Sequence, residues 1–128
     1  MREIKFRGYD KFDKRWVYGY GLHQSIFIDG SSNAYVTAGI REVFIVDKES
    51  AGQYTSIKDY EGKEIYEGDI VETTRALNHI VGVVTMIKGC WYIQDGKDSY
   101  YRLIPRFGTA ENKVIGNIYE NKNLLEEE

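Results

Sequence analysis

The sequence lacks the features that are typical of secreted and membrane proteins. It contains one cysteine, Cys90, so an intramolecular disulfide bond is excluded. No apolar run approaches the roughly 20 residues that cross a bilayer, because the richest window, Ile80 to Ile87, has the length of a strand. The first residues also lack the apolar segment of a secretory signal. We therefore expect a cytoplasmic protein with no membrane span.

Signatures of catalysis and of cofactor binding are missing as well. There is no Gly-Lys-Ser/Thr phosphate loop and no Gly-x-Ser-x-Gly elbow, and Gly19-Tyr20-Gly21 lacks the third glycine of a dinucleotide fingerprint. His23, His79 and Cys90 stand far apart, with no second metal ligand at short spacing. Five carboxylates between Asp59 and Asp69 favour turn-forming and solvated roles over acid/base work. We predict no catalytic residue, no metal and no cofactor.

The first part of the chain has the patterns of β-strands joined by turns. Ile4 and Phe6 alternate with charged neighbours, which predicts a strand over residues 3–7 with one face buried and one face wet. A polar turn over residues 10–14 leads to a second strand, residues 15–20, and so to a hairpin. Runs at 25–28 and 34–37 flank the turn formers of residues 29–33, which predicts another hairpin. The continuous apolar run of residues 42–47 predicts a strand buried on both faces.

The stretch from Gln53 to Val71 organises the rest of the chain. It holds two turn signals, one at residues 59–62 and one at residues 67–69, each with a glycine that tolerates positive φ. Five short strand-like runs then follow, at residues 70–73, 80–87, 90–94, 100–107 and 113–119. Five such antiparallel strands close or nearly close into a small barrel. We expect an N-terminal hairpin region over residues 1–52, a barrel over residues 53–119 that packs with it as one compact unit, and an acidic tail over residues 120–128 with a brief helix at residues 123–127.

Three blocks of sequence stand in an order that is known from one family. They are Met1-Arg2-Glu3-Ile4-Lys5-Phe6-Arg7, then Tyr54-Thr55-x-x-Lys58-Asp59-x-x-Gly62-Lys63-Glu64-Ile65-Tyr66-Glu67-Gly68-Asp69-Ile70-Val71, and finally Val114-Ile115-Gly116-Asn117-Ile118-Tyr119-Glu120-Asn121. Together they resemble the YopX-like family of phages and prophages of low-GC bacteria. The resemblance implies a mainly β protein, with antiparallel hairpins leading into an SH3-like barrel, and it supplies no catalytic residue. The family usually has Gly-Leu at Ser56-Ile57 and Ala-Trp at Gly8-Tyr9, so a turn that depends on glycine at position 56 is left open.

Aromatic residues interleaved with cations form two candidate binding clusters. Aromatics make up 14% of the chain, with eleven tyrosines, and tyrosine combines an apolar ring with a polar tip that suits recognition surfaces. Such clusters pack a barrel core, contact a protein partner, or stack bases and neutralise phosphates. The candidate residues are Arg7, Tyr9, Arg15, Trp16 and Tyr18 in the first cluster, and Trp91, Tyr92, Tyr101, Arg102 and Arg106 in the second.

The charge distribution favours a protein partner over a nucleic acid. The net charge is −3 and the pI is near 5.5, without the basic excess typical of nucleic-acid binders. Residues 1–15 hold six basic and three acidic residues, whereas the tail is acidic, so opposite ends of two copies would attract each other. We predict a non-enzymatic module that binds an unknown protein partner or itself as a homo-oligomer. The alternative is a single-stranded nucleic-acid-binding or regulatory β-barrel protein.

Overall fold

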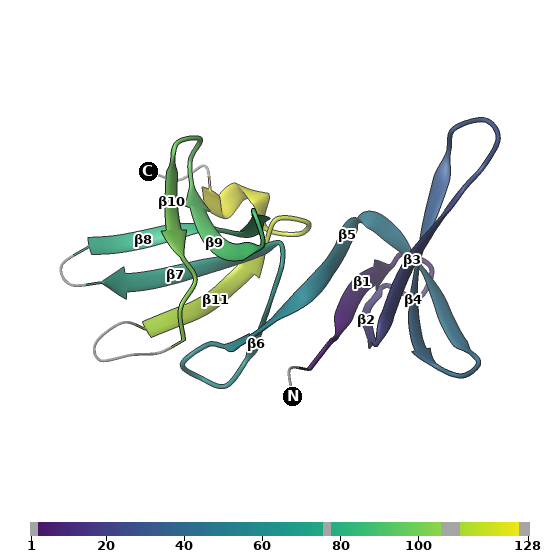
Figure 1. The fold of residues 1–128 in the computed structure, drawn as a ribbon, viewed down its shortest axis with the longest axis horizontal. Helices are drawn as coiled ribbons and strands as arrows, with labels where there is room; N and C mark the ends of the chain where they lie inside the picture. Colours follow the sequence, from purple (N-terminus) through teal and green to yellow (C-terminus); the bar gives the residue numbers. More distant parts are fainter. Residues whose placement is uncertain (1–2, 76–77, 106–110, 126–128) are drawn as a thin grey trace. The chain divides into compact units, whose positions relative to one another are not determined.

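The computed structural model describes residues 3–75, 78–105 and 111–125, and it is mainly antiparallel β-structure (Figure 1). The chain divides into two compact units, which we call unit 1 (residues 1–54) and unit 2 (residues 55–128). The boundary falls inside strand β5, Glu42–Lys58, a continuous strand of 17 residues. Each unit has a hydrophobic core of its own.

Unit 1 is an antiparallel sheet built largely from hairpins. Its strands lie in the order β2-β1-β5-β4-β3. Besides β5, they are β1 (Phe6–Asp10), β2 (Arg15–Gly19), β3 (Gly21–Ile26) and β4 (Ser32–Gly39). β1 pairs with β2, and β3 pairs with β4, so both predicted hairpins are present. The second one is shifted: β3 ends at Ile26, and Phe27 and Ile28, expected in its first strand, lie in the connection. The β3–β4 hairpin extends outward as an arm of the sheet in Figure 1.

Aspartates fix both of these hairpin turns. The Asp10 Oδ1 atom accepts the backbone N–H groups of Phe12 at 2.9 Å and Asp13 at 3.2 Å. At the β3–β4 turn, the Asp29 Oδ1 atom accepts the hydroxyl of Ser31 at 2.6 Å and its N–H at 2.9 Å. These two bonds, the hydroxyl foremost, stabilise the carboxylate and lower the pKa of Asp29. Each turn is therefore closed by side-chain acceptors for backbone donors, as polar turn residues typically do.

The core of unit 1 covers only one face of its outer strands. It consists of Val17, Ala34, Val36 and Val46, with Phe44 packed against them. The expectation that residues 42–47 are buried on both faces is wrong, because Val43 and Ile45 are 51% and 48% exposed. The alternate residues of the run point to the core, and these two point away from it.

The predicted first strand is also corrected. β1 begins at Phe6 and not at Glu3, and Ile4 is exposed. Arg7, expected on the wet face, is only 6% exposed. Its guanidinium carbon lies 4.6 Å from the centroid of the Trp16 ring. Burial is compatible with the cation because the aromatic face attracts it and the arginine stem is apolar.

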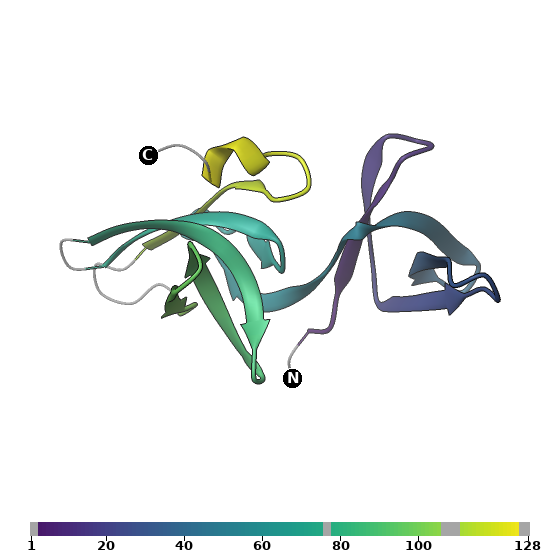
Figure 2. The same ribbon diagram turned by 90° about the horizontal axis from the view of Figure 1, so that it is seen from above.

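Unit 2 is a five-stranded antiparallel sheet in the order β10-β9-β8-β7-β11. Its strands are β7 (Asp69–Arg75), β8 (Asn78–Ile87), β9 (Cys90–Asp95), β10 (Ser99–Arg102) and β11 (Glu111–Asn117), and the short β6 (Glu64–Tyr66) pairs with β5. Figure 2 shows that β8 and β9 curve strongly. The curved sheet encloses a core of Ile65, Val71, Ile80, Val84, Ile93, Leu103 and Val114. Among the described strands, no pairing joins β10 to β11, so the sheet is open along this ladder.

Two buried aspartates build the turns of the organising stretch. The Asp59 Oδ1 atom accepts the N–H groups of Glu61 and Lys63, both at 2.9 Å, and its Oδ2 atom accepts the N–H of Val114 in β11 at 3.1 Å. The Asp69 Oδ2 atom accepts the N–H of Tyr66 at 2.7 Å. The predicted turn-forming role is confirmed for both aspartates. In addition, Asp59 joins the first turn of unit 2 to its last strand.

Ser56 resolves the question of the glycine turn. Its φ is 71°, in the left-handed region that favours glycine. Beside it, the hydroxyl of Thr55 donates to the carbonyl of Ile65 at 2.8 Å and accepts the N–H of Ile57 at 3.1 Å. The left-handed turn is thus present, although serine stands where the resembling family has glycine.

The C-terminal helix is shorter than expected and begins one residue earlier. It is a single 3-10 turn, η1 (Lys122–Leu125), while residues 126–128 lie outside the described residues. Asn121 precedes it: the Asn121 Oδ1 atom accepts the N–H of Asn117 at 3.1 Å. Leu124 and Leu125 lie against unit 2, as described next.

Candidate interaction surfaces

The first predicted cluster is divided between two faces of the β1–β2 hairpin. Arg7 pairs with Tyr18 and Tyr9 pairs with Trp16, so these four side chains share one face. The Tyr9 and Trp16 rings meet edge to face, with centroids 5.5 Å apart. Arg15 lies on the opposite face, with its guanidinium carbon 5.3 Å from the centroid of the Phe44 ring. Since Arg7 is buried, it does not offer a surface charge, and the cluster is largely hairpin packing.

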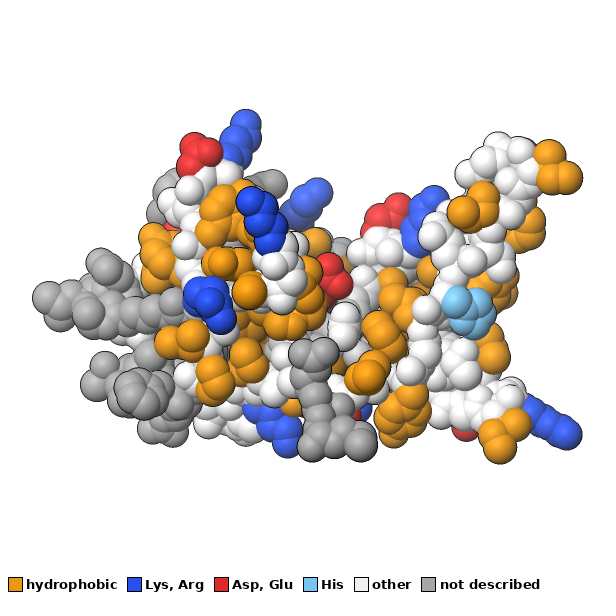
Figure 3. Space-filling model, in the orientation of Figure 1, with side chains coloured by type: hydrophobic (Ala, Val, Ile, Leu, Met, Phe, Trp, Pro, Cys, Tyr) orange, Lys and Arg blue, Asp and Glu red, His pale blue; other side chains and the backbone are white. Residues whose placement is uncertain are grey.

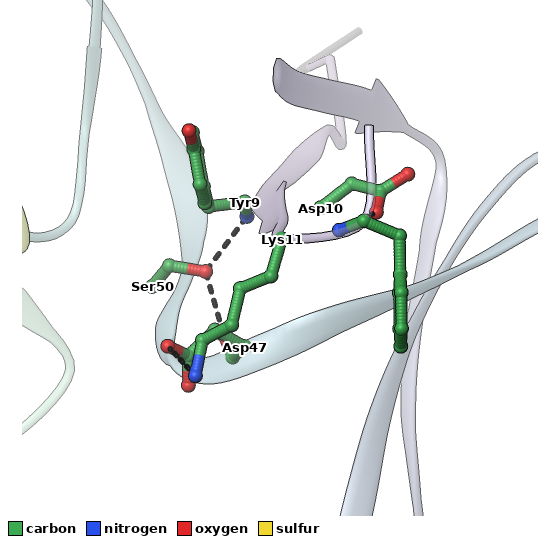
Figure 4. A network of polar contacts seen from close by, with 6 residues as sticks. Tyr9, Asp10, Lys11, Asp47 and Ser50 are labelled. Carbon is green, nitrogen blue, oxygen red and sulfur yellow. Dashed lines mark hydrogen bonds and ion pairs between the residues drawn. The ribbon is translucent and has the colours of Figure 1, made fainter. Parts of the chain in front are cut away.

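A polar network fastens this hairpin to β5 (Figure 4). The pairing of β1 with β5 shifts between Arg7 and Tyr9, which leaves the N–H of Tyr9 outside the regular ladder. The Ser50 hydroxyl accepts that N–H at 2.7 Å and donates to the carbonyl of Asp47 at 2.5 Å. Lys11 Nζ lies 3.2 Å from the Asp47 carboxylate. The network satisfies backbone groups at a bulge, which is a structural role.

The second predicted cluster is divided in the same way. Tyr92 pairs with Arg102, and Tyr101 pairs with Ile93. Trp91 and Tyr101 therefore share the inner face, where both pack against the core of unit 2. Tyr92, Tyr100 and Arg102 share the outer face, and the Tyr92 and Tyr100 rings lie edge to face at 6.5 Å. Arg106 lies outside the described residues.

A groove runs along this outer face of unit 2. It has a volume of about 500 Å³, within the range of small-molecule sites. Its apolar lining comes from Val81 and Val83 of β8 and from Ile118, Leu124 and Leu125 near the end of the described chain. His79 also lines the groove, and its Nε2 atom lies 2.8 Å from the Glu72 carboxylate. The lining of the groove is mixed, with apolar side chains beside Gln94, Asp95 and His79.

An exposed apolar surface lies on unit 1, at positions that the sequence patterns do not single out. On the sheet face away from the core, His23, Tyr35 and Ile45 are successive cross-strand neighbours. The His23 and Tyr35 rings stack with centroids 5.1 Å apart. Thr37 and Val43 continue the face by one more pair. Figure 3 shows hydrophobic side chains over this end of unit 1, including its two hairpin tips.

Both hairpin tips carry exposed apolar side chains. The β3–β4 tip presents Ile26, Phe27 and Ile28, and the β4–β5 tip presents Ile40. The sequence around Ile40 could have indicated this surface. An isoleucine between glycine and arginine in a tight turn is too far from the core to be buried in it. We call the exposed sheet face and these two tips together the apolar surface of unit 1.

Chemical sites of other kinds have little support in the described part of the chain. There, no group of three or more His, Cys, Asp or Glu residues is placed to hold a metal ion. None of the helices described there has the length and apolar character to span a membrane. Cys90 is a free, half-buried thiol.

Comparisons with known proteins place the chain as a whole. The model of the YopX protein family matches residues 5–126. A crystal structure of protein EF1440 from Enterococcus faecalis is similar over 95% of this chain and 97% of that chain, with 24% sequence identity and a TM-score of 0.48. A comparison with curated proteins finds no match.

Proposed function

This chain belongs to the YopX protein family, and from that premise we propose that it is a non-enzymatic module that assembles with a protein partner or with itself. The apolar surface of unit 1 is the observation that carries the proposal. Single exposed apolar residues are normal on soluble proteins, but contiguous patches mark interaction sites. Here the exposed His23 and Ile45 and the half-buried Tyr35 between them are neighbours across three strands, and two hairpin tips carry further exposed apolar side chains.

Burial of this surface would contribute favourable free energy to association. Fully burying a valine or isoleucine side chain yields roughly 1.5 to 3 kcal/mol, so completing the burial of a half-exposed one yields about 1 kcal/mol. Val43 and Ile45 each offer this gain, and the two tips add four more exposed apolar side chains. Tyr35 and His23 contribute flat rings at the centre of the face, the kind of group enriched in interfaces.

Replacing Ile45 by lysine is the direct test. Ile45→Lys places a charge at the centre of the apolar surface, where its desolvation opposes association. We expect light scattering to give a lower molar mass for Ile45→Lys than for the wild-type protein. Met86→Lys is the matched control, since Met86 is a similarly exposed apolar residue on unit 2, and it should keep the wild-type mass. A wild-type protein that is monomeric and also retains nothing from fractions of host lysate contradicts the proposal.

The biological setting and the finer fold belong to the same proposal. The family resemblance supports a phage or prophage accessory protein that acts in the cytoplasm of a bacterial host. We also propose that the curved sheet of unit 2 is an SH3-like barrel. Its short antiparallel strands and single enclosed core support that assignment.

Single-stranded nucleic-acid binding is a second candidate, favoured by the outer face of β9 and β10. Tyr92 and Tyr100 offer rings for base stacking beside the exposed Arg102. On this hypothesis, Arg102→Ala weakens the binding of a labelled single-stranded oligonucleotide and reduces its salt dependence. Lys122→Ala, which also removes a single cation from unit 2, serves as the control. No shift of the oligonucleotide at low salt rejects this candidate.

A further inference from the structure

Strand β3 is the last strand on its side of the unit 1 sheet. In the described structure it pairs with β4 alone, through six consecutive residue pairs from Gly21–Thr37 to Ile26–Ser32. The side chains of Leu22, His23, Gln24 and Ile26 are exposed. A regular strand with an open edge presents a row of backbone donors and acceptors to another strand.

The hydrogen-bond pattern identifies the residues that present those groups. The N–H of Phe27 donates to the carbonyl of Ser31 at 2.8 Å, so this pair is a hydrogen-bonded pair of the hairpin. Hydrogen-bonded and non-bonded pairs alternate along an antiparallel ladder. Leu22, Gln24 and Ile26 therefore direct their backbone N–H and C=O groups away from β4, toward the open edge.

The edge lacks the features that usually prevent strand pairing. Proteins protect open edges with lysine, proline, bulges or inward-pointing charges. β3 reads Gly-Leu-His-Gln-Ser-Ile, without a lysine, a carboxylate or a proline, and its register with β4 is unbroken. Leu22 and Ile26 lie on one face of it, 36% and 74% exposed.

From this geometry we infer that β3 pairs with β3 of a second copy, antiparallel and about a two-fold axis at Gln24. In this register Gln24 opposes the partner's Gln24, and Leu22 opposes the partner's Ile26. Each of the three outward-directed residues then forms a hydrogen-bonded pair with a residue of the second copy. Both apolar side chains gain a cross-strand neighbour on the same face.

A second copy fits this edge because the edge is self-complementary. The two-fold axis places each outward-directed residue opposite an outward-directed residue of the second copy, and no like charges face each other. Because both copies use the same surface, the contact is isologous and closes as a dimer. The two unit 1 sheets then form one continuous sheet, which extends the apolar face that contains His23 and Tyr35. This inference rests on the proposed function as an assembly module and names its partner and its register.

Opposite charges at Gln24 test the register. Gln24→Lys places two lysines directly opposite each other at the axis, and Gln24→Glu places two glutamates there, so each variant alone should lose the contact. An equimolar mixture should restore it, because lysine then opposes glutamate. Light scattering or sedimentation should show a twofold lower molar mass for each variant than for the wild-type protein, and the wild-type mass for the mixture. Far-UV circular dichroism checks that both variants are folded, as expected for an exposed edge position.

The alternative outcomes separate this inference from the proposed function. If both variants keep the mass of an oligomeric wild type, the copies associate through another surface, and the β3 inference is overturned while self-assembly stands. If the mixture stays as dissociated as the single variants, the two-fold register at Gln24 is wrong. If the wild-type protein is a monomer, the inference also fails, and the proposed function then depends on capture of a protein partner.

Discussion

Replacing Asp59 by alanine is expected to lower the free energy of unfolding of unit 2 by about 3 to 5 kcal/mol. The carboxylate accepts three backbone N–H groups, from Glu61, Lys63 and Val114. Hydrogen bonds to charged groups contribute roughly 1.5 to 3 kcal/mol each, and a buried donor left without an acceptor costs about 1 to 3 kcal/mol. The Val114 bond is buried, so water cannot easily replace it. The loss should therefore approach that of a large core truncation.

The measurement is denaturant unfolding followed by tryptophan fluorescence. The protein has two tryptophans, Trp16 in unit 1 and Trp91 beside the core of unit 2, so a Trp16→Phe background reports on unit 2. Asp59→Asn keeps one acceptor oxygen and should lose less stability than Asp59→Ala. Glu61→Ala, an exposed position in the same turn, should change the free energy of unfolding by no more than about 0.5 kcal/mol. A loss below about 1 kcal/mol for Asp59→Ala contradicts the proposed role of this carboxylate.

Ile93→Ala is expected to have a similarly large effect, about 2 to 5 kcal/mol. Ile93 is fully buried in β9 and belongs to the central cluster of unit 2. Its truncation removes apolar contacts within this core and leaves a cavity that a hydrogen-bonded sheet cannot readily close. Unfolding in the Trp16→Phe background measures the loss here too.

Met86→Ala provides the comparison for this core truncation. Met86 lies in the neighbouring strand, β8, but is exposed, so the same assay should detect little change. Equal losses for the two variants would mean that Ile93 does not occupy the centre of the core.

Turn chemistry is the part of the fold that the sequence predicts best. Asp10, Asp29 and Asp59 each sit at a predicted turn, and each accepts nearby backbone N–H groups in the structure. Such bonds are local, so neighbouring residues contain the information that determines them. The long-range bond from Asp59 to Val114 could not be predicted in this way, because it depends on how β11 returns to the first turn.

Sequence patterns did not predict correctly which side chains of unit 1 are buried. Residues 42–47 contain an uninterrupted apolar run, which is typical of a strand covered on both faces. The pattern does not reveal that the unit 1 core is small and covers one face, so Val43 and Ile45 remain exposed. For the same reason the alternation around Phe6 did not predict that Arg7 packs under Trp16.

The candidate binding residues follow the same logic. Interleaved aromatics and cations identified two real hairpins, but strand alternation divides each cluster: Arg15 lies on the opposite face from the rest of the first cluster, and the described part of the second cluster is split evenly. Trp91 and Tyr101 pack against the core, whereas Tyr92 and Arg102 face outward. The apolar surface of unit 1 was missed because its residues belong to three different strands, β3, β4 and β5, and meet only in the folded sheet.

The placement of strand partners also fixes the order in which the two units become complete during synthesis. All described strand partners of the unit 1 sheet, including the short β6 that pairs with β5, lie before residue 67, so the ribosome has supplied that sheet before it begins β7. Unit 2 is different, because β7 cannot pair with β11, and the Asp59 carboxylate cannot accept the N–H of Val114, until the end of the chain has been synthesised. The open β3 edge is therefore in the growing chain while unit 2 is still being translated, and a neighbouring nascent chain on the same messenger would be the nearest second copy.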